Sequence, residues 1–250
     1  MPTRIKTLHA FDFDNTLAIT PSIIGVQRTT PEGISDPTFE DWILDQGLDV
    51  QEIENEGTDN EIMWFDSGMF ANYEAKHRRD LDYLESNGFE DKYDFSKTAS
   101  VDLDATTGIE SMLSLLQQAY GDPNAKVVVI TARSGTGAIP SLSGGSVAAT
   151  NVGDIQKFLQ GQGVSLDASS VSTAGDAGGS PQAKVQALQS YIDQYDPEFL
   201  YFYDDSASNV DAVVGLCADL YPHLKIKAFK LDNAGNIQSI EGCYESLIRF

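Results

Sequence analysis

The chain has 250 residues, which is long enough for one large domain or for a core domain that carries a smaller insert. Its 38 acidic and 16 basic side chains give a formal net charge of -22, which disfavours nucleic acid and anionic membranes as main partners. No apolar stretch is long enough for a signal peptide or a membrane span, so we expect a soluble cytoplasmic protein.

Short apolar runs, typical of strands buried on both faces of a parallel sheet, recur along the chain. They cover residues 5–13, 127–130, 171–173, 199–203 and 226–229. Amphipathic patterns typical of helices separate the later runs. These patterns cover residues 109–116, 155–159, 185–192 and 210–217. The alternation predicts an α/β fold with a doubly wound, mainly parallel sheet, whose ligands bind beyond the carboxyl ends of its strands.

Two stretches break this alternation. Residues 18–100 hold no clear strand–helix unit and carry much polar and aromatic sequence of helical character. They predict a mostly helical insert in a core formed by residues 1–17 and 101–250. Residues 134–153 are rich in Gly, Ser, Ala and Thr and predict a flexible loop within the core, either a mobile flap near the site or a loop without function.

The first predicted strand ends on two carboxylates, Asp12 and Asp14. In a continuing strand these side chains would point to the same face, because side chains alternate with a period of two. Two close anions on an apolar base need a cation between them, or one must stay protonated. The pair therefore predicts a metal site with a nucleophile and an acid/base partner. A turn at the strand end, begun by Asp14 and Asn15, is the alternative.

The later strand ends and one helix start supply groups that suit a phosphate site. A hydroxyl and a guanidinium follow the run at 127–130, and two adjacent carboxylates follow the run at 199–203. A lysine lies just inside a helix that Ser180 could cap and Pro181 could open. Cationic and hydroxyl side chains can donate hydrogen bonds to an anion. These groups are Thr131, Arg133, Lys184, Asp204 and Asp205.

In chain order, these motifs resemble those of the haloacid dehalogenase (HAD) superfamily of phosphohydrolases. The resemblance covers about residues 5–20 and 105–232, and each motif stands at a predicted strand end or helix start. It implies a Rossmann-like core, a Mg²⁺ ion and an aspartyl-phosphate intermediate. The four HAD motifs are similar here to Asp12-x-Asp14-x-Thr16, Thr131, Lys184 and the pair Asp204-Asp205.

The resemblance also implies catalytic and metal-binding roles. Asp12 would be the nucleophile, and Asp14 would protonate the leaving oxygen and then activate water. Mg²⁺ would be held by the Asp12 carboxylate, the backbone carbonyl of Asp14 and Asp205. Asp204 would act beside the ion or through water. An acid at position 14 indicates phosphatase or phosphotransferase chemistry rather than dehalogenation.

The resemblance, together with the guanidinium of Arg133 at a strand end, gives the candidate substrate-binding residues. Thr131 and Lys184 would bind the transferring phosphoryl oxygens, and Lys184 would also neutralise Asp12. The structural alternatives are that Thr131 is only a turn residue and that Lys184 is only a solvated lysine on a helix. For Arg133 there are two interpretations, a contact with the substrate and a surface ion pair. The full set is Thr16, Thr131, Arg133 and Lys184.

A second DxDxT sequence lies at residues 102–106, with Asp102, Asp104 and Thr106. It follows a polar stretch instead of an apolar run and leads straight into a predicted helix. Thr107 and Glu110 have the spacing of a capping box, so helix initiation explains this copy. We expect it to be structural and not catalytic.

The insert stands where HAD proteins often carry a cap domain. Its densest basic cluster is Lys76–Arg79, which either contacts an anionic substrate or lies on a helix face paired with nearby acids.

The sequence as a whole predicts a Mg²⁺-dependent phosphatase that hydrolyses a small phosphomonoester, with a nucleotide or sugar phosphate favoured. A polynucleotide 3′-phosphatase is one alternative, and the net charge argues against it. A catalytically silent binding or structural module is the other, and the presence of every catalytic residue type argues against that.

Overall fold

The computed structural model describes residues 5–58, 60–77 and 81–243. The chain forms two compact units. The core unit comprises Met1–Thr20, Val101–Thr136 and Thr150–Phe250, and the insert unit comprises Pro21–Ser100 and Gly137–Ala149. Within the described residues, no helix has the length and apolar character that a membrane crossing requires.

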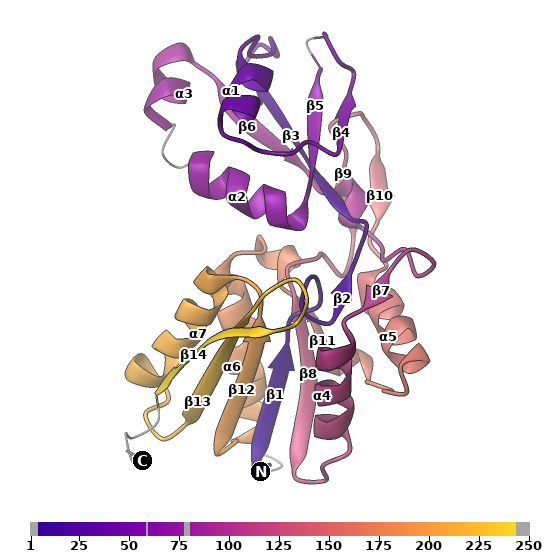
Figure 1. Ribbon diagram of the computed structural model, residues 1–250, viewed down its shortest axis with the longest axis vertical. Coiled ribbons are helices and arrows are strands. Elements are labelled where there is room, and N and C mark those ends of the chain that lie inside the picture. Colours follow the sequence, from indigo (N-terminus) through magenta and orange to yellow (C-terminus); the bar gives the residue numbers. More distant parts are fainter. Residues whose placement is uncertain (1–4, 59, 78–80, 244–250) are drawn as a thin grey trace. The chain divides into compact units, whose positions relative to one another are not determined.

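The core unit contains a six-stranded sheet in the order β11-β8-β1-β12-β13-β14 (Figure 1). All neighbours are parallel except β14, which pairs antiparallel with β13. The predicted α/β fold with a mainly parallel sheet is confirmed, and each predicted strand is present. The strands are β1 (Thr7–Phe11), β8 (Ala125–Thr131), β11 (Val171–Thr173), β12 (Phe199–Asp204), β13 (Lys225–Leu231) and β14 (Ile237–Cys243).

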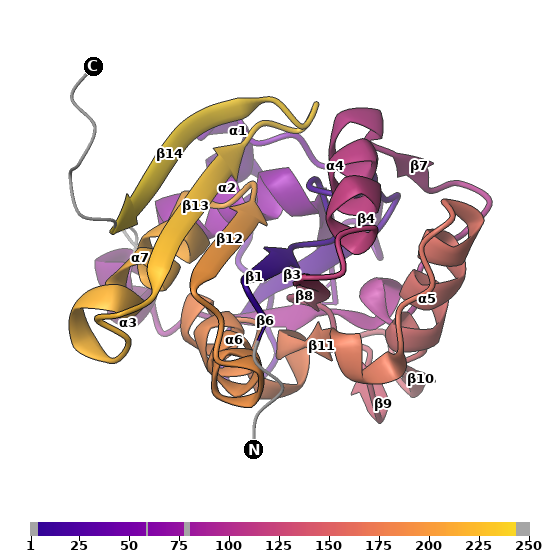
Figure 2. The same cartoon turned by 90° about the horizontal axis from the view of Figure 1, so that it is seen from below.

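Helices pack against both faces of this sheet, as Figure 2 shows. One hydrophobic core joins α4 and α5 to Phe11 and Val129, and the other joins α6 and α7 to Leu8 and Val128. Successive side chains of β1 and β8 thus enter opposite cores, which is why these strands read as continuous apolar runs. The helices are α4 (Glu110–Tyr120), α5 (Asn151–Gly161), α6 (Pro181–Tyr195) and α7 (Ala207–Asp219).

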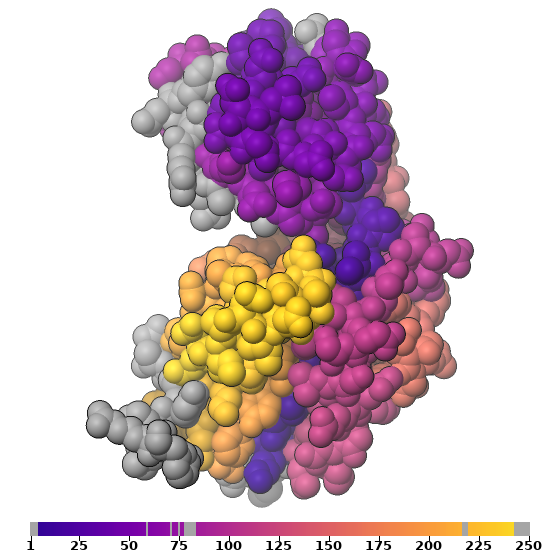
Figure 3. Space-filling view, viewed as in Figure 1, coloured from indigo at the N-terminus to yellow at the C-terminus, as the bar shows by residue number. Residues whose placement is uncertain are grey.

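The outer strand β14 forms one edge of the sheet, and part of the β13–β14 surface is visible in yellow in Figure 3. Ile237 and Ile240 on this strand are 52% and 51% exposed. The sequence analysis did not predict β14, because its residues lack the continuous apolar character of a buried strand.

Two helix starts were predicted, with different outcomes. Ser180 caps α6, since its Oγ accepts a hydrogen bond from the Ala183 backbone N–H at 3.2 Å, and Pro181 is the first helical residue. The capping box at Thr107 and Glu110 is wrong. Helix α4 has Ile109 at its N-cap and no side-chain cap. Thr107 instead pairs with Ile19 in a short antiparallel ladder between β2 (Ala18–Ile19) and β7 (Thr107–Gly108).

The prediction of a mostly helical insert is wrong, because the insert unit contains a four-stranded antiparallel sheet in the order β4-β5-β3-β6. Its central strand β5 is a run of four buried apolar residues, and periodicity does not separate such a short run from a helix segment. The strands are β3 (Ile23–Thr29), β4 (Glu52–Glu54), β5 (Ile62–Asp66) and β6 (Glu90–Asp94). The helices are α1 (Phe39–Asp45), α2 (Ser67–His77) and α3 (Leu81–Asn87).

The segment predicted as a flexible loop at 134–153 contains an antiparallel hairpin, formed by β9 (Ala138–Pro140) and β10 (Ser146–Ala148). Gly137–Ala149 belongs to the insert unit instead of the core. The Asp94 carboxylate accepts hydrogen bonds from the Ser141 hydroxyl at 2.8 Å and the Leu142 backbone N–H at 2.6 Å. These contacts tie the hairpin to β6 of the same unit, and short strands in a Gly/Ser-rich sequence give no apolar signal by which to predict them.

Candidate active site

The candidate site lies at the carboxyl ends of three adjacent strands of the core unit, β8, β1 and β12. Phe11 is in register with Val129 on one side and with Tyr203 on the other. The ladder continues one step further, because the Asp12 backbone N–H donates to the Tyr203 carbonyl at 2.9 Å. The residues at these strand ends are therefore brought together at one edge of the sheet, as the sequence predicts: Asp12 directly follows β1, and Thr131 and Asp204 are the last residues of β8 and β12.

Lys184, near the start of α6, lies between two carboxylates of this edge. Its Nζ is 2.7 Å from Asp12 Oδ1 and 2.8 Å from Asp204 Oδ2. All three side chains are at most 5% exposed. Burial lowers the pKa of Lys184, but the two carboxylates outweigh it and raise that pKa above its ordinary value. The lysine is thus a buried ammonium ion that offsets part of the local negative charge, and not a solvated helix residue.

The carboxylate of Asp204 has further donors within its own segment. The Asn209 side-chain amide donates to Oδ1 at 2.9 Å, and the Ser206 backbone N–H donates to the same oxygen at 2.8 Å. Asp204 is fully buried, so these bonds and Lys184 stabilise an ion that water does not reach. The sequence analysis did not assign Asn209 to the site, although it is a polar residue on the buried face of α7.

Asp12, Asp204 and Asp205 form a carboxylate cluster whose ligand oxygens lie within 4.8 Å of one another. Burial raises the pKa of Asp12 well above its usual range, and nearby carboxylates add to this shift against the opposing effect of Lys184. Burial and the charge of Asp204 raise the pKa of Asp205 to about 6. Asn15, which has a φ of 57°, hydrogen-bonds to the Asp205 side chain.

These residues fit a Mg²⁺ ion. The three side chains offer only carboxylate oxygens, which a hard cation prefers. Three carboxylates share one ammonium group, so the ionised cluster carries more negative charge than Lys184 can neutralise. Asp12 and Asp205 would hold the ion directly, because the oxygens of Asp204 already accept several hydrogen bonds. The predicted ligation by the Asp14 carbonyl stays a prediction.

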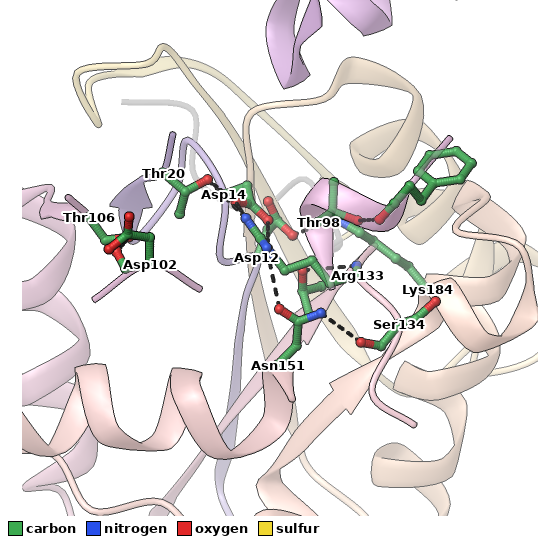
Figure 4. Close-up of polar contacts among 12 residues, drawn as sticks. Asp12, Asp14, Thr20, Thr98, Asp102, Thr106, Arg133, Ser134, Asn151 and Lys184 are labelled. Carbon is green, nitrogen blue, oxygen red and sulfur yellow. Dashed lines mark hydrogen bonds and ion pairs between the residues drawn. The ribbon is translucent and has the colours of Figure 1, made fainter. Parts of the chain in front are cut away.

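Asp14 is held by a different cation, Arg133. The guanidinium Nε donates to Oδ2 at 2.8 Å and Nη2 donates to Oδ1 at 2.7 Å, and the Thr20 hydroxyl also donates to Oδ1 at 2.7 Å. Burial raises the pKa of Asp14, but Arg133 and then Thr20 bring it below its ordinary value. Figure 4 shows the Arg133 guanidinium beside Asp14, with Lys184 next to Asp12.

Arg133 is only 4% exposed, so it forms a buried ion pair, and the alternative of a surface ion pair is wrong. Its Nη1 donates to Asn151 Oδ1 at 3.3 Å, and the Asn151 amide donates to the Ser134 carbonyl at 2.7 Å. Thr20 and Asn151 had not been assigned to the site, because no periodicity or motif in their segments marks them. A contact between Arg133 and substrate stays a prediction.

The two predicted threonines are fully buried. The Thr131 hydroxyl accepts a hydrogen bond from the Arg133 backbone N–H at 3.2 Å. Thr16 Oγ1 has no hydrogen-bond partner within the described residues. Their predicted contacts with substrate stay predictions.

The second DxDxT sequence forms a turn. Asp102 Oδ1 accepts from the backbone N–H groups of Asp104 at 3.1 Å and Ala105 at 3.2 Å, and the Thr106 hydroxyl donates to the Asp102 carbonyl at 2.6 Å. Such contacts are typical of an aspartate that stabilises its own turn. The second DxDxT sequence thus has a structural role, as expected, but this role is to form a turn and not to cap helix α4.

The basic cluster Lys76–Arg79 is described only in part, because Arg78 and Arg79 lie outside the described residues. Lys76 donates to the Gln46 carbonyl at 2.5 Å. His77 Nδ1 lies 2.8 Å from Asp91 Oδ2. The two described members are therefore engaged by other residues of the insert unit.

Comparison with known proteins adds no support for a particular function. No family model matches the chain, and no curated protein matches it. Among solved structures, the chain is similar to the HAD domain of the effector protein Lem4 from Legionella pneumophila, with 15% sequence identity and a TM-score of 0.36, over 94% of this chain and 90% of that chain. At this identity and TM-score, the likeness transfers neither residue roles nor activity.

Proposed function

We propose that the chain is a Mg²⁺-dependent phosphatase of the HAD type, which hydrolyses a small phosphomonoester through a phosphoryl group carried on Asp12. The observation that carries this proposal is the position of Asp12 at the carboxyl end of β1. There its carboxylate is 2.7 Å from Lys184 and belongs to a cluster with Asp204 and Asp205. A buried nucleophile, a fixed cation and an oxygen-only metal site are what transfer to a carboxylate requires.

In the first half of the reaction, a carboxylate oxygen of Asp12 attacks phosphorus while the bond to the leaving oxygen breaks. Oδ1 accepts the hydrogen bond from Lys184, so Oδ2 is the oxygen proposed to attack. The leaving oxygen takes a proton from Asp14. Bound Mg²⁺ supplies positive charge that lessens the repulsion between carboxylate and phosphate.

In the second half, a water molecule attacks the phosphoryl group on Asp12 and passes its proton to Asp14. The bond between Asp12 and phosphorus breaks, inorganic phosphate leaves, and both carboxylates return to their starting forms. Arg133 and Thr20 favour the ionised form of Asp14, which is the form that a base needs. Thr131 and Lys184 are proposed to bind the phosphoryl oxygens throughout.

We further propose a nucleotide or sugar phosphate as the substrate class. The net charge of -22 disfavours long polyanions, whereas a small phosphate ester needs only the few donors of a buried site.

Phosphate release from a panel of nucleoside monophosphates and sugar phosphates, measured with and without Mg²⁺, tests this proposal. Asp12→Asn should lower kcat on the order of 10³-fold or more, because the amide is a poor nucleophile. Asp102→Asn, in the second DxDxT sequence, is the matched control and should retain wild-type activity. No activity of the wild type on any substrate would refute the enzyme and favour a silent module, and equal losses in both variants would refute the role of Asp12.

A further inference from the structure

We infer that Arg133 is a positioning residue that fixes the carboxylate of Asp14, and not a ligand of the substrate phosphate. The inference rests on the proposed function, in which Asp14 is the acid/base residue. It arises from the three hydrogen bonds that hold the Asp14 carboxylate within the core unit.

The geometry of the pair restricts the orientation of Asp14. Two parallel bonds, from Nε to Oδ2 at 2.8 Å and from Nη2 to Oδ1 at 2.7 Å, set the plane of the carboxylate. The hydroxyl of Thr20, the residue directly after β2, donates a third bond to this carboxylate at 2.7 Å. A single point charge would leave the carboxylate free to rotate, whereas a planar fork does not.

Arg133 is itself fixed by the core unit. Nη1 donates to Asn151 Oδ1 at 3.3 Å, and Asn151, at the start of α5, is fully buried and donates to the Ser134 carbonyl at 2.7 Å. The backbone N–H of Arg133 also donates to Thr131 Oγ1. The orientation of Asp14 thus depends on a chain of contacts that begins in α5.

A direct phosphate contact would compete with this arrangement. Of the five guanidinium N–H groups, four donate to Asp14, Thr20 or Asn151. Turning the group toward a phosphate would leave the mostly buried Asp14 carboxylate, 20% exposed, without its cation, which is costly for a buried ion pair. A positioning role keeps the pair intact during the reaction.

The test is a double-mutant cycle with Arg133→Met and Asp14→Asn. We compare kcat/KM for an alkyl phosphate, whose leaving oxygen needs a proton, with that for p-nitrophenyl phosphate, whose leaving group is stable as an anion. Arg133→Met should lower kcat/KM for the alkyl ester about 10²-fold, because a displaced catalytic group loses about this much, and should affect the aryl ester less. In the Asp14→Asn background, the same change should cost no more than about 3-fold.

Three further measurements separate positioning from phosphate binding and from loss of the fold. The inhibition constant of inorganic phosphate should stay unchanged in Arg133→Met. Arg133→Lys keeps the charge but not the fork, so it should keep the wild-type melting temperature and still lose activity on the alkyl ester. Crystal structures of the wild type and Arg133→Met should show the Asp14 carboxylate turned away only in the variant.

The inference is overturned if phosphate inhibition weakens as much as kcat/KM falls, if the two substitutions act additively, or if Asp14 keeps its orientation without Arg133. A wild type that is inactive on every phosphate ester overturns the proposed function, and with it the inference. Failure of the inference alone is recognised by an active wild type with unimpaired Arg133 variants.

Discussion

Replacing Lys184 by methionine should destabilise the core unit strongly. The ammonium lies 2.7 Å from Asp12 and 2.8 Å from Asp204, and its side chain is 3% exposed. Methionine fills a similar volume but leaves two buried carboxylates without a counter-charge. Removing one partner of a buried ion pair costs about 3–5 kcal/mol, and we expect the free energy of unfolding to fall by that amount at pH 8.

Acidic pH should partly rescue this variant. The pKa of Asp12 is already raised by burial, and the loss of Lys184 raises it further. A carboxyl whose folded pKa lies above its unfolded value binds a proton more readily in the folded state, so stability falls as pH rises through that range. The destabilisation by Lys184→Met should therefore be smaller at pH 5 than at pH 8.

Hydrogen exchange of peptides from β1 and β12, measured over a urea series, reports the stability of the core unit in this experiment. Lys157→Met is the control, because Lys157 is 66% exposed and forms a surface pair with Asp154 at 3.1 Å. Exposed pairs contribute about 0–1 kcal/mol. A loss below about 1 kcal/mol in Lys184→Met would refute the view that Lys184 is the ion that stabilises this carboxylate cluster.

Two further predictions concern other charges. The pKa of Asp205 is about 6, so stability without metal should fall as pH rises from about 4 to 6, and stabilisation by Mg²⁺ should be larger at pH 8 than at pH 5. Melting temperatures test this, and Asp205→Asn should reduce the pH dependence of the Mg²⁺ effect without abolishing it, because the pKa of Asp12 is also raised. In the insert unit, Asp91→Asn leaves buried Arg28, whose Nε is 2.9 Å from Asp91, without its main anion and should cost about 3–5 kcal/mol. Both tryptophans lie in this unit, so the urea midpoint of tryptophan fluorescence measures that loss, and an unchanged midpoint would contradict it.

The residues that could be placed from the sequence are those that depend on local patterns. Asp12, Thr131 and Asp204 each follow an apolar run, and in a parallel sheet such ends meet at one edge. Lys184 could be placed at a helix start because Ser180 and Pro181 mark that start. In both cases a local pattern of a few residues was needed. For the strand ends, a general rule of sheet topology was needed as well.

The residues that could not be placed depend on contacts between distant segments. Arg133 pairs with Asp14 across 119 positions of the chain, and no local pattern distinguishes such a partner from a phosphate ligand. Asn151 stands in a Gly/Ser-rich segment without periodicity, and Thr20 follows a strand of two residues. The antiparallel sheet of the insert was missed for a related reason, because β5 is too short for its period to separate strand from helix.

The two carboxylates of the first motif acquire different electrostatic environments from different parts of the core. Asp14 meets Arg133 beyond the end of β8, and its pKa is lowered. Asp12 meets Lys184 from α6, yet burial and its acidic neighbours raise its pKa above the usual range. Two neighbouring acids whose pKa values are moved in opposite directions can take different roles in one reaction.

This difference links the proposed nucleophile to the metal. A carboxyl with a raised pKa is a poor nucleophile until further positive charge stabilises its ionised form. Lys184 alone leaves the pKa of Asp12 raised, and an ion held by Asp12 and Asp205 would supply further positive charge that favours the ionised nucleophile. Arg133 favours the ionised form of Asp14 without any metal, so Asp14 has to bind a proton before it can act as the acid in the first half of the reaction. Metal dependence is therefore expected at the step in which Asp12 attacks phosphorus, and the acid/base residue is expected to be in place beforehand.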